Sequence, residues 1–165
     1  MPFFQKHTSD PADMWPSQKR VALALDLPRV TLNAIMFDAP SDLLREIFGK
    51  PSNRWPFHAE KFVYAENALV VETVENRIAY FAVAIARDEA EGIGPGQLDI
   101  VAPEGAPFSI DGGTPIEAVI TRLGEPVEID REEDETVFYY SINGCRMEFE
   151  CAPDGHIRRV NWFPE

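Results

Sequence analysis

The 165 residues of this chain suffice for one large domain or two small ones, and its 45% apolar and 26% charged residues are typical of a globular protein. A chain of this length buries roughly 70% of its unfolded surface, so it requires no metal or disulfide for stability. The net charge of −13 argues against binding to nucleic acid or anionic membranes, because their phosphates require Lys and Arg. That charge serves either solubility alone or recognition of a basic partner.

The beginning of the chain and its cysteines indicate a cytoplasmic protein. Residues 1–20 contain neither the apolar stretch nor the cleavage site of a signal peptide, and the apolar run at 21–27 is too short to span a bilayer. Cys145 and Cys151 lie on one strand pattern, ~20 Å apart when extended. A disulfide requires Cα atoms within about 7 Å, so we expect two free thiols.

Composition and turn residues divide the chain into four parts. We expect an irregular, proline-containing arm at 1–20, a first repeat at 21–86, a linker with a connecting strand at 87–106, and a second repeat at 107–165. The glycine-rich stretch at 92–96 lacks the lysine and the following helix of a phosphate-binding loop, so we interpret it as linker. We expect the parts to form one compact domain.

The first repeat combines strand patterns with one short helix. Pro40 suits the first turn of a helix, and Gly49 followed by Pro51 ends it. The apolar residues between them recur at helical spacing and form one face: Leu43, Leu44, Ile47 and Phe48. Strands are expected at 21–27, 30–37, 61–65, 68–73 and 77–86.

The second repeat shows the same elements more clearly. Thr114 and Glu117 match a capping box, with Pro115 at the first helical position, so we expect a helix to begin there. A core-facing stripe follows, formed by Ile116, Val119, Ile120 and Leu123. Strands are expected at 107–110, 136–141, 145–151 and 156–163, with hairpin turns at Asn143-Gly144 and Asp154-Gly155.

The two helix ends carry the same signature, Gly49-Lys50-Pro51 in the first repeat and Gly124-Glu125-Pro126 in the second. In each repeat the signature lies between a helix and a series of strands. This order predicts an α+β fold of two tandem βαβββ repeats, with short helices packed on antiparallel sheet.

The repeated unit resembles the architecture of beta-lactamase inhibitory proteins. The residues that carry the resemblance are 113–119 and 123–126, and, less well, 40–51. Members of that family bind and inhibit other proteins through the open face of the sheet, and many are secreted and disulfide-bonded. This chain departs from them, because it shows no signal peptide and no cysteine pair in each repeat. The resemblance therefore implies a cytosolic binder, most simply a bacterial immunity protein that neutralises a cognate toxin.

Side chains suited to catalysis or metal binding are scattered along the sequence. His7, His58 and His156 are far apart, and no pair of metal ligands has the spacing of a zinc finger or a zinc protease. No G-x-S-x-G motif is present, and both cysteines alternate with apolar residues, where a thiol is inert. We expect no enzymatic activity, no cofactor and no metal.

Charged and aromatic residues of the second repeat are the candidates for partner binding. The acidic run at 128–135 is either a solvated loop or a docking element for a basic partner. Neighbouring tyrosines at 139 and 140 must point to opposite sheet faces, so one of them faces outward. The predicted partner-binding residues are Tyr140, Arg146, Glu148, Glu150, Asp130, Glu132, Glu133 and Asp134.

The sequence thus predicts a non-enzymatic protein-binding or inhibitory module that is monomeric or homodimeric, with a basic toxin or enzyme as the simplest partner. One alternative is a structural module of a larger complex, which predicts an exposed apolar patch. The other is a small-molecule-binding domain, which requires a closed pocket with convergent polar groups.

Overall fold

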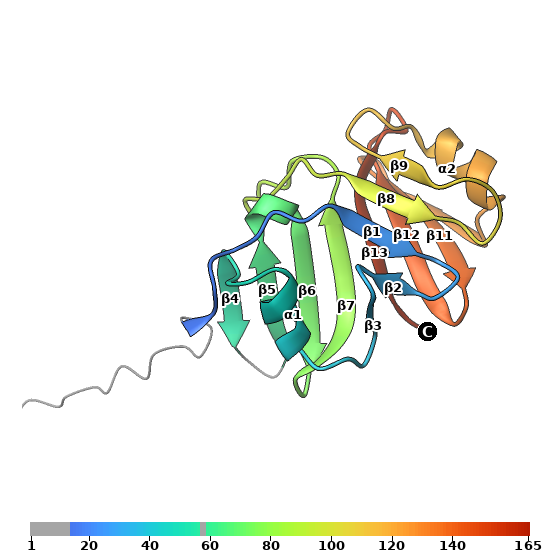
Figure 1. Cartoon of the computed structure of the whole chain (residues 1–165). Coiled ribbons are helices and arrows are strands. Elements are labelled where there is room, and N and C mark those ends of the chain that lie inside the picture. The colour runs from blue at the N-terminus through green and yellow to red at the C-terminus, as the bar shows by residue number, and fades with distance from the viewer. Residues whose placement is uncertain (1–13, 57–58) are drawn as a thin grey trace, which may run out of the picture.

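Two stacked β-sheets form most of the molecule (Figure 1). The computed structural model describes residues 14–56 and 59–165. The larger sheet has eight strands in the order β10-β11-β12-β13-β7-β6-β5-β4. Their bounds are β4 (Asn53–Pro56), β5 (Ala59–Tyr64), β6 (Leu69–Val74), β7 (Arg77–Ala84), β10 (Glu128–Arg131), β11 (Thr136–Ile142), β12 (Cys145–Cys151) and β13 (Ile157–Pro164).

The smaller sheet covers one face of the larger one and has five short strands in the order β3-β2-β1-β8-β9. Their bounds are β1 (Leu23–Asp26), β2 (Thr31–Leu32), β3 (Ile35–Met36), β8 (Leu98–Val101) and β9 (Phe108–Ile110). The helical elements are α1 (Asp42–Ile47), α2 (Ile116–Leu123) and the 3-10 turn η2 (Ala65–Asn67). In the described part of the chain, no helix combines the length and the apolar character needed to cross a membrane.

The predicted α+β class, with two tandem βαβββ repeats and short helices packed on antiparallel sheet, is wrong, because the molecule is mainly β. With six and eight residues, α1 and α2 are too short to form a layer of their own. The smaller sheet takes that place, and it combines strands that the sequence analysis assigned to different repeats. β4 and β10, which were not predicted as strands, complete the two ends of the larger sheet.

Each helix leads into an antiparallel meander of four strands rather than three. The first meander runs from β4 to β7 and the second from β10 to β13, and we call them the first half and the second half of the larger sheet. The halves meet where β7 and β13 pair antiparallel. This seam places the last strand of one meander beside the last strand of the other.

One continuous core lies between the two sheets. Phe81 of β7 and Trp162 of β13 stack across the seam with ring centroids 5.2 Å apart. Leu25 of β1 and Ile100 of β8 are fully buried in the same cluster. Because this cluster contains side chains from both halves and from the smaller sheet, the halves share a core.

The start of α2 differs from the predicted capping box. The Thr114 hydroxyl accepts the backbone N–H of Asp111 at 3.0 Å, and no side chain caps the helix. The Ile116 N–H donates instead to the carbonyl of Gly155 at 3.0 Å. The β12–β13 turn therefore provides the helix with the acceptor that the sequence pattern had assigned to a side chain.

Candidate protein-binding face

The outer face of the larger sheet is the one opposite the smaller sheet, and in the second half it carries polar side chains. In β12 the core-facing residues are buried (Met147, Phe149 and Cys151), and the residues between them are half-buried on the outer face (Arg146, Glu148 and Glu150). This confirms the predicted alternation. Paired residues of neighbouring strands share a side, so Tyr139 and Asn161, both opposite Glu148, extend the outer face across β11 and β13.

A loop covers the first half of this outer face. Ile93 is only 2% exposed, and it packs against a small cluster that includes Val63, Val70 and Ala82. We call residues 88–93 the cover loop. The composition of these residues predicted part of a linker, but in the structure they close over apolar side chains of the sheet.

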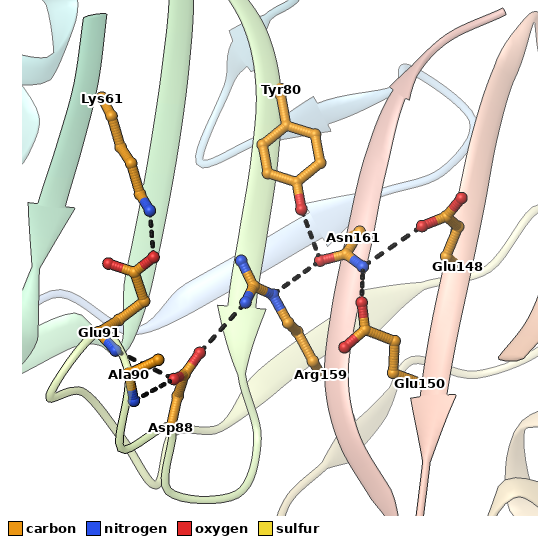
Figure 2. A network of polar contacts seen from close by, with 9 residues as sticks. All are labelled: Lys61, Tyr80, Asp88, Ala90, Glu91, Glu148, Glu150, Arg159 and Asn161. Atoms are coloured by element: carbon orange, nitrogen blue, oxygen red, sulfur yellow. Dashed lines mark hydrogen bonds and ion pairs between the residues drawn. The ribbon is translucent and has the colours of Figure 1, made fainter. Parts of the chain in front are cut away.

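Two ion pairs attach the cover loop to the strands beneath it (Figure 2). Asp88 Oδ2 accepts from Arg159 Nη1 at 3.1 Å, and Glu91 pairs with Lys61. The other oxygen of Asp88 accepts the backbone N–H groups of Ala90 and Glu91 at 3.0 and 3.1 Å. Asp88 therefore fixes both the internal turn of the loop and its position on β13.

Asn161, which is 2% exposed, connects the cover loop to the second half (Figure 2). Its Oδ1 accepts from the Tyr80 hydroxyl at 2.8 Å and from Arg159 Nε at 3.0 Å. Its Nδ2 donates to Glu150 at 2.5 Å and to Glu148 at 3.4 Å. The buried amide thus has partners for both its oxygen and its nitrogen, as buried polar groups require. Burial raises the pKa of Tyr80 to about 12, so its hydroxyl remains a donor at neutral pH.

Arg146 organises the exposed part of the second half. Its guanidinium lies 4.2 Å from the centroid of the Tyr139 ring. It also contacts Glu128 at 2.9 Å and Glu148 at 3.8 Å. Burial raises the pKa of the Glu148 carboxyl. We call the outward residues of this region the acidic face: Glu128, Asp130, Tyr139, Arg146, Glu148 and Glu150.

The structure brings most of the predicted partner-binding residues to one region, with one exception. Asp130 lies on exposed β10 opposite Val137 of β11. Arg146, Glu148 and Glu150 lie on β12, on the other side of β11. The exposed residues Glu132, Glu133 and Asp134 form the β10–β11 turn. The run at 128–135 is therefore an edge strand followed by a turn, rather than a loop along its whole length.

Tyr140 is the exception, and the expectation that it lies on the exposed face is wrong. It is only 4% exposed, its ring meets Phe149 edge-on at 5.6 Å, and its hydroxyl donates to the carbonyl of Gly124 at 2.9 Å. Burial raises its pKa to about 12. Tyr139 is the outward tyrosine, because the pairing of Tyr140 with buried Met147 places Tyr140 on the core side.

The sequence analysis also missed the residues that join the two halves. Arg159 and Asn161 are two residues apart on β13 and alternate with apolar residues. This alternation could have predicted that both side chains lie on the outer face of the sheet. Asp88 lies in a stretch that the composition marked as linker. No local pattern indicates its contact with Arg159, since the two are far apart in the sequence.

The described histidine and the two cysteines belong to no group of described side chains suited to holding a metal ion. Within residues 14–56 and 59–165, no three His, Cys, Asp or Glu side chains are placed to hold a metal ion. His156 pairs with Asp154 in a turn, and His7 and His58 lie outside the described residues. Both thiols are free, and burial raises the pKa of Cys151 to about 12, which makes this thiol unreactive.

A cleft of about 730 Å³ is a second candidate site. It is lined by residues 20–23, 66–68, 95–97 and 111–113 and by Asp99. Two carboxylates in its wall already have partners, because Asp99 accepts from Ser109 and Asp111 accepts from the Gly113 N–H. These two carboxylates are engaged within the fold, as Glu148 and Glu150 of the acidic face are.

The fold and this face together define a mainly β protein of two stacked sheets. A loop covers the apolar half of its outer face, and the polar half has the acidic face. No family model matches the sequence, and no curated protein matches it.

Among the solved structures that share the fold are two bacterial proteins. One is YjgB, a DUF4309 family protein from Bacillus subtilis, with a TM-score of 0.55 and 11% identity over 81% of this chain and 84% of that chain. The other is a cysteine-rich secretory protein from Staphylococcus aureus, with a TM-score of 0.51 and 10% identity over 78% of this chain. This chain spans 44% of that protein. At these identities the similarity shows the fold alone, and the resemblance to beta-lactamase inhibitory proteins stays a prediction.

Proposed function

We propose that this protein is a non-enzymatic binding module, that its contact surface is the acidic face, and that its partner presents basic residues there. The observation that carries the proposal is the difference in cover along the outer face of the sheet. The cover loop closes the first half, whereas Tyr139, Arg146 and the carboxylates of the second half stay accessible to a partner.

The charges of this surface favour a cationic partner. Carboxylates outnumber arginines on the acidic face, and its one arginine, Arg146, is already shared between Glu128 and Glu148. Arg159, at the border of the face, is engaged by Asp88. Together with the net charge of −13, this arrangement accelerates encounter with a basic surface, and the effect weakens as salt is added.

A cognate toxin in the cytoplasm is the simplest partner within this proposal. An acidic inhibitor that blocks a basic enzyme gains fast association from its charge. The test is to express the product of the neighbouring gene in a naive bacterial host, alone and together with this protein. We expect the neighbouring product to inhibit growth and this protein to restore it. A neighbouring product that is harmless alone would contradict the toxin assignment.

Site-specific photo-crosslinking tests the location of the binding surface. A photoreactive amino acid replaces Ser141, which is exposed and lies opposite Arg146 on β11. The matched control carries the same amino acid at Glu75, an exposed turn position between β6 and β7. Both proteins are irradiated in host cells, and the adducts are identified by mass spectrometry.

We expect a specific protein adduct from position 141, and we expect that adduct to disappear when Glu128 and Asp130 are both replaced by Lys. Replacing Glu75 and Glu104 by Lys makes the same change in net charge away from the acidic face, and it should leave the adduct unchanged. Equal adducts from positions 141 and 75, or an adduct insensitive to the reversal at 128 and 130, would overturn the proposal.

The cleft supports a second candidate function, the binding of a small molecule. Its lining comes from four separate segments, 20–23, 66–68, 95–97 and 111–113, and from Asp99. Native mass spectrometry of protein purified from its host tests this function. A copurified ligand that is lost when Gly112 and Gly113 are both replaced by Val would favour the cleft over the acidic face.

A further inference from the structure

β10 forms the free end of the larger sheet, next to the acidic face. It pairs with β11 on one side and is the last strand in the sheet order. All four of its residues are exposed. A strand in this position presents backbone N–H and C=O groups that a further strand can pair with.

The register identifies which backbone groups are available. The Glu132 N–H donates to the Glu135 carbonyl at 2.8 Å, so this pair is a hydrogen-bonded one. Hydrogen-bonded and non-hydrogen-bonded pairs alternate along an antiparallel ladder. The N–H and C=O groups of Ile129 and Arg131 therefore point away from β11, toward the free edge.

The side chains of β10 differ between its two faces. Glu128 and Asp130 lie opposite Tyr139 and Val137 on the outer face of the sheet. Ile129 lies opposite buried Phe138, on the core side, and is 36% exposed. Val127, just before the strand, is 68% exposed. An added strand would meet carboxylates on one side, and on the other side the apolar surface of Val127 and Ile129 next to Arg131.

We propose that β10 is a docking edge for an extended segment of the partner, in which basic residues alternate with apolar ones. The partner strand pairs with the backbone of Ile129 and Arg131, its basic side chains contact Glu128 and Asp130, and its apolar side chains pack on Ile129 and Val127. This mode of recognition adds a strand to an existing sheet. It rests on the proposed function, because it specifies how a basic partner binds to this part of the molecule.

A second copy of this chain fits the edge less well. Antiparallel pairing of β10 with its own copy would bring Glu128 and Asp130 of the two chains together on the same face, and like charges directly opposite each other are destabilising. The other end of the sheet also differs. β4 ends at Pro56, which has no N–H to donate, and the nearby Ser52 is held by Gln18 at 2.9 Å.

Synthetic peptides test the proposal directly. The probe is a fluorescein-labelled peptide of alternating Lys and Val, and the matched control has the same composition with all Lys before all Val. We expect the alternating peptide to bind at least 10-fold more tightly in fluorescence anisotropy. We also expect the amide hydrogens of Ile129 and Arg131 to exchange at least 10-fold more slowly in its presence. Equal binding of the two peptides, or unchanged exchange at these amides, would overturn the proposal.

Ile129→Pro removes an outward N–H that the β10–β11 ladder does not use. We expect this variant to bind the alternating peptide at least 10-fold more weakly. Its affinity for the control peptide, with all Lys before all Val, should stay unchanged. If the variant fails to fold, N-methylation of every second residue of the peptide removes hydrogen bonds from the partner side, and it should weaken binding equally. Undiminished binding after N-methylation contradicts strand addition.

The outcomes also separate this proposal from the one it rests on. Failure of the alternating peptide, with a specific cross-link from position 141 retained, overturns strand addition and leaves the acidic face as the contact surface. Failure of both experiments overturns the proposed function itself.

Discussion

The two halves of the larger sheet have the same strand order and different surfaces. Both are four-stranded antiparallel meanders that follow a short helix. The outer face of the first half is apolar around Val70 and Ala82, and the cover loop closes it with Ile93. The outer face of the second half carries Tyr139, Arg146 and carboxylates, and among the described residues no strand continues the sheet beyond β10.

A shared strand order therefore does not determine which side chains a sheet exposes or whether a loop covers them. Apolar side chains on the first half require cover from solvent, and the loop between β7 and β8 supplies it. The polar side chains of the second half are satisfied by one another through Asn161 and Arg146, so that half stays ordered without a cover. Four substitutions test how separate the halves are.

Trp162→Ala removes the aromatic side chain that spans the seam between the halves. Because Trp162 is 2% exposed and stacks on Phe81 at 5.2 Å, we expect a loss of about 3–5 kcal/mol in unfolding free energy. Urea denaturation followed by far-UV circular dichroism measures this loss. Trp55→Ala, at a site 40% exposed on β4, is the matched control and should cost about 1 kcal/mol or less. Two separate transitions in the wild-type protein would show that the halves unfold independently.

Asn161→Ala removes the amide that links the outer faces of the two halves. The Tyr80 hydroxyl and Arg159 then lose an acceptor, and we expect a loss of about 1–3 kcal/mol. Ser141→Ala, at an exposed position on β11, serves as the control and should change stability by less than about 0.5 kcal/mol. An Asn161→Ala variant as stable as the control would show that the network contributes nothing to folding.

Asp88→Ala tests whether the cover over the first half depends on its attachment to β13. The substitution removes the Arg159 ion pair and the acceptor for two loop N–H groups, so we expect a loss of about 1–2 kcal/mol. Hydrogen exchange at the Ile93 amide should accelerate. Glu89→Ala breaks the exposed pair with Arg87 and should have an effect below about 0.5 kcal/mol. Unchanged exchange at Ile93 would mean that apolar packing alone holds the loop.

Glu148→Gln tests the electrostatics of the second half through pH. Burial raises the pKa of Glu148 in the folded protein, so the folded state binds its proton more tightly than the unfolded chain does. The contribution of this carboxyl to stability is therefore present at acid pH and is lost as pH rises through its folded pKa. We expect the Gln variant, which mimics the neutral acid, to be the more stable protein at pH 7 and to lose that advantage toward pH 3.

Urea denaturation across this pH range measures the difference. Glu128→Gln, at a position with 60% side-chain exposure, is the control for removing a carboxylate that contacts Arg146. A Glu148→Gln variant that is less stable than wild type at pH 7 would indicate that the contact with Arg146 outweighs the effect of burial.

Local signals predicted local structure well. The alternation at 145–151 predicted β12. Asn143-Gly144 predicted the turn before it, and these residues have positive φ angles of 52° and 77°. Gly49 also ended its helix as predicted. Its φ is 74°, and a Cβ there would collide with the carbonyl of Ser17. Each of these features depends on a few neighbouring residues.

The fold class could not be predicted in the same way, because it depends on contacts between distant residues. β1 pairs in parallel with β8, and no pattern at 23–26 or 98–101 indicates that partner. β10 was missed because Glu and Asp are disfavoured in strands, although an exposed edge tolerates them. The faces of Tyr139 and Tyr140 were ambiguous, since only the register with β12 decides which is buried.

The seam between β7 and β13 has a consequence for synthesis of the chain. In the finished protein β7 lies in the interior of the larger sheet, but its partner β13 begins only at residue 157. Joining strands so distant in the chain is slow, because loop-closure entropy opposes the contact until it forms. While the ribosome makes the intervening residues, the apolar strand β7 is an unpaired edge. The nascent chain is therefore most prone to aggregation in the interval between completion of the first meander and arrival of the last strand.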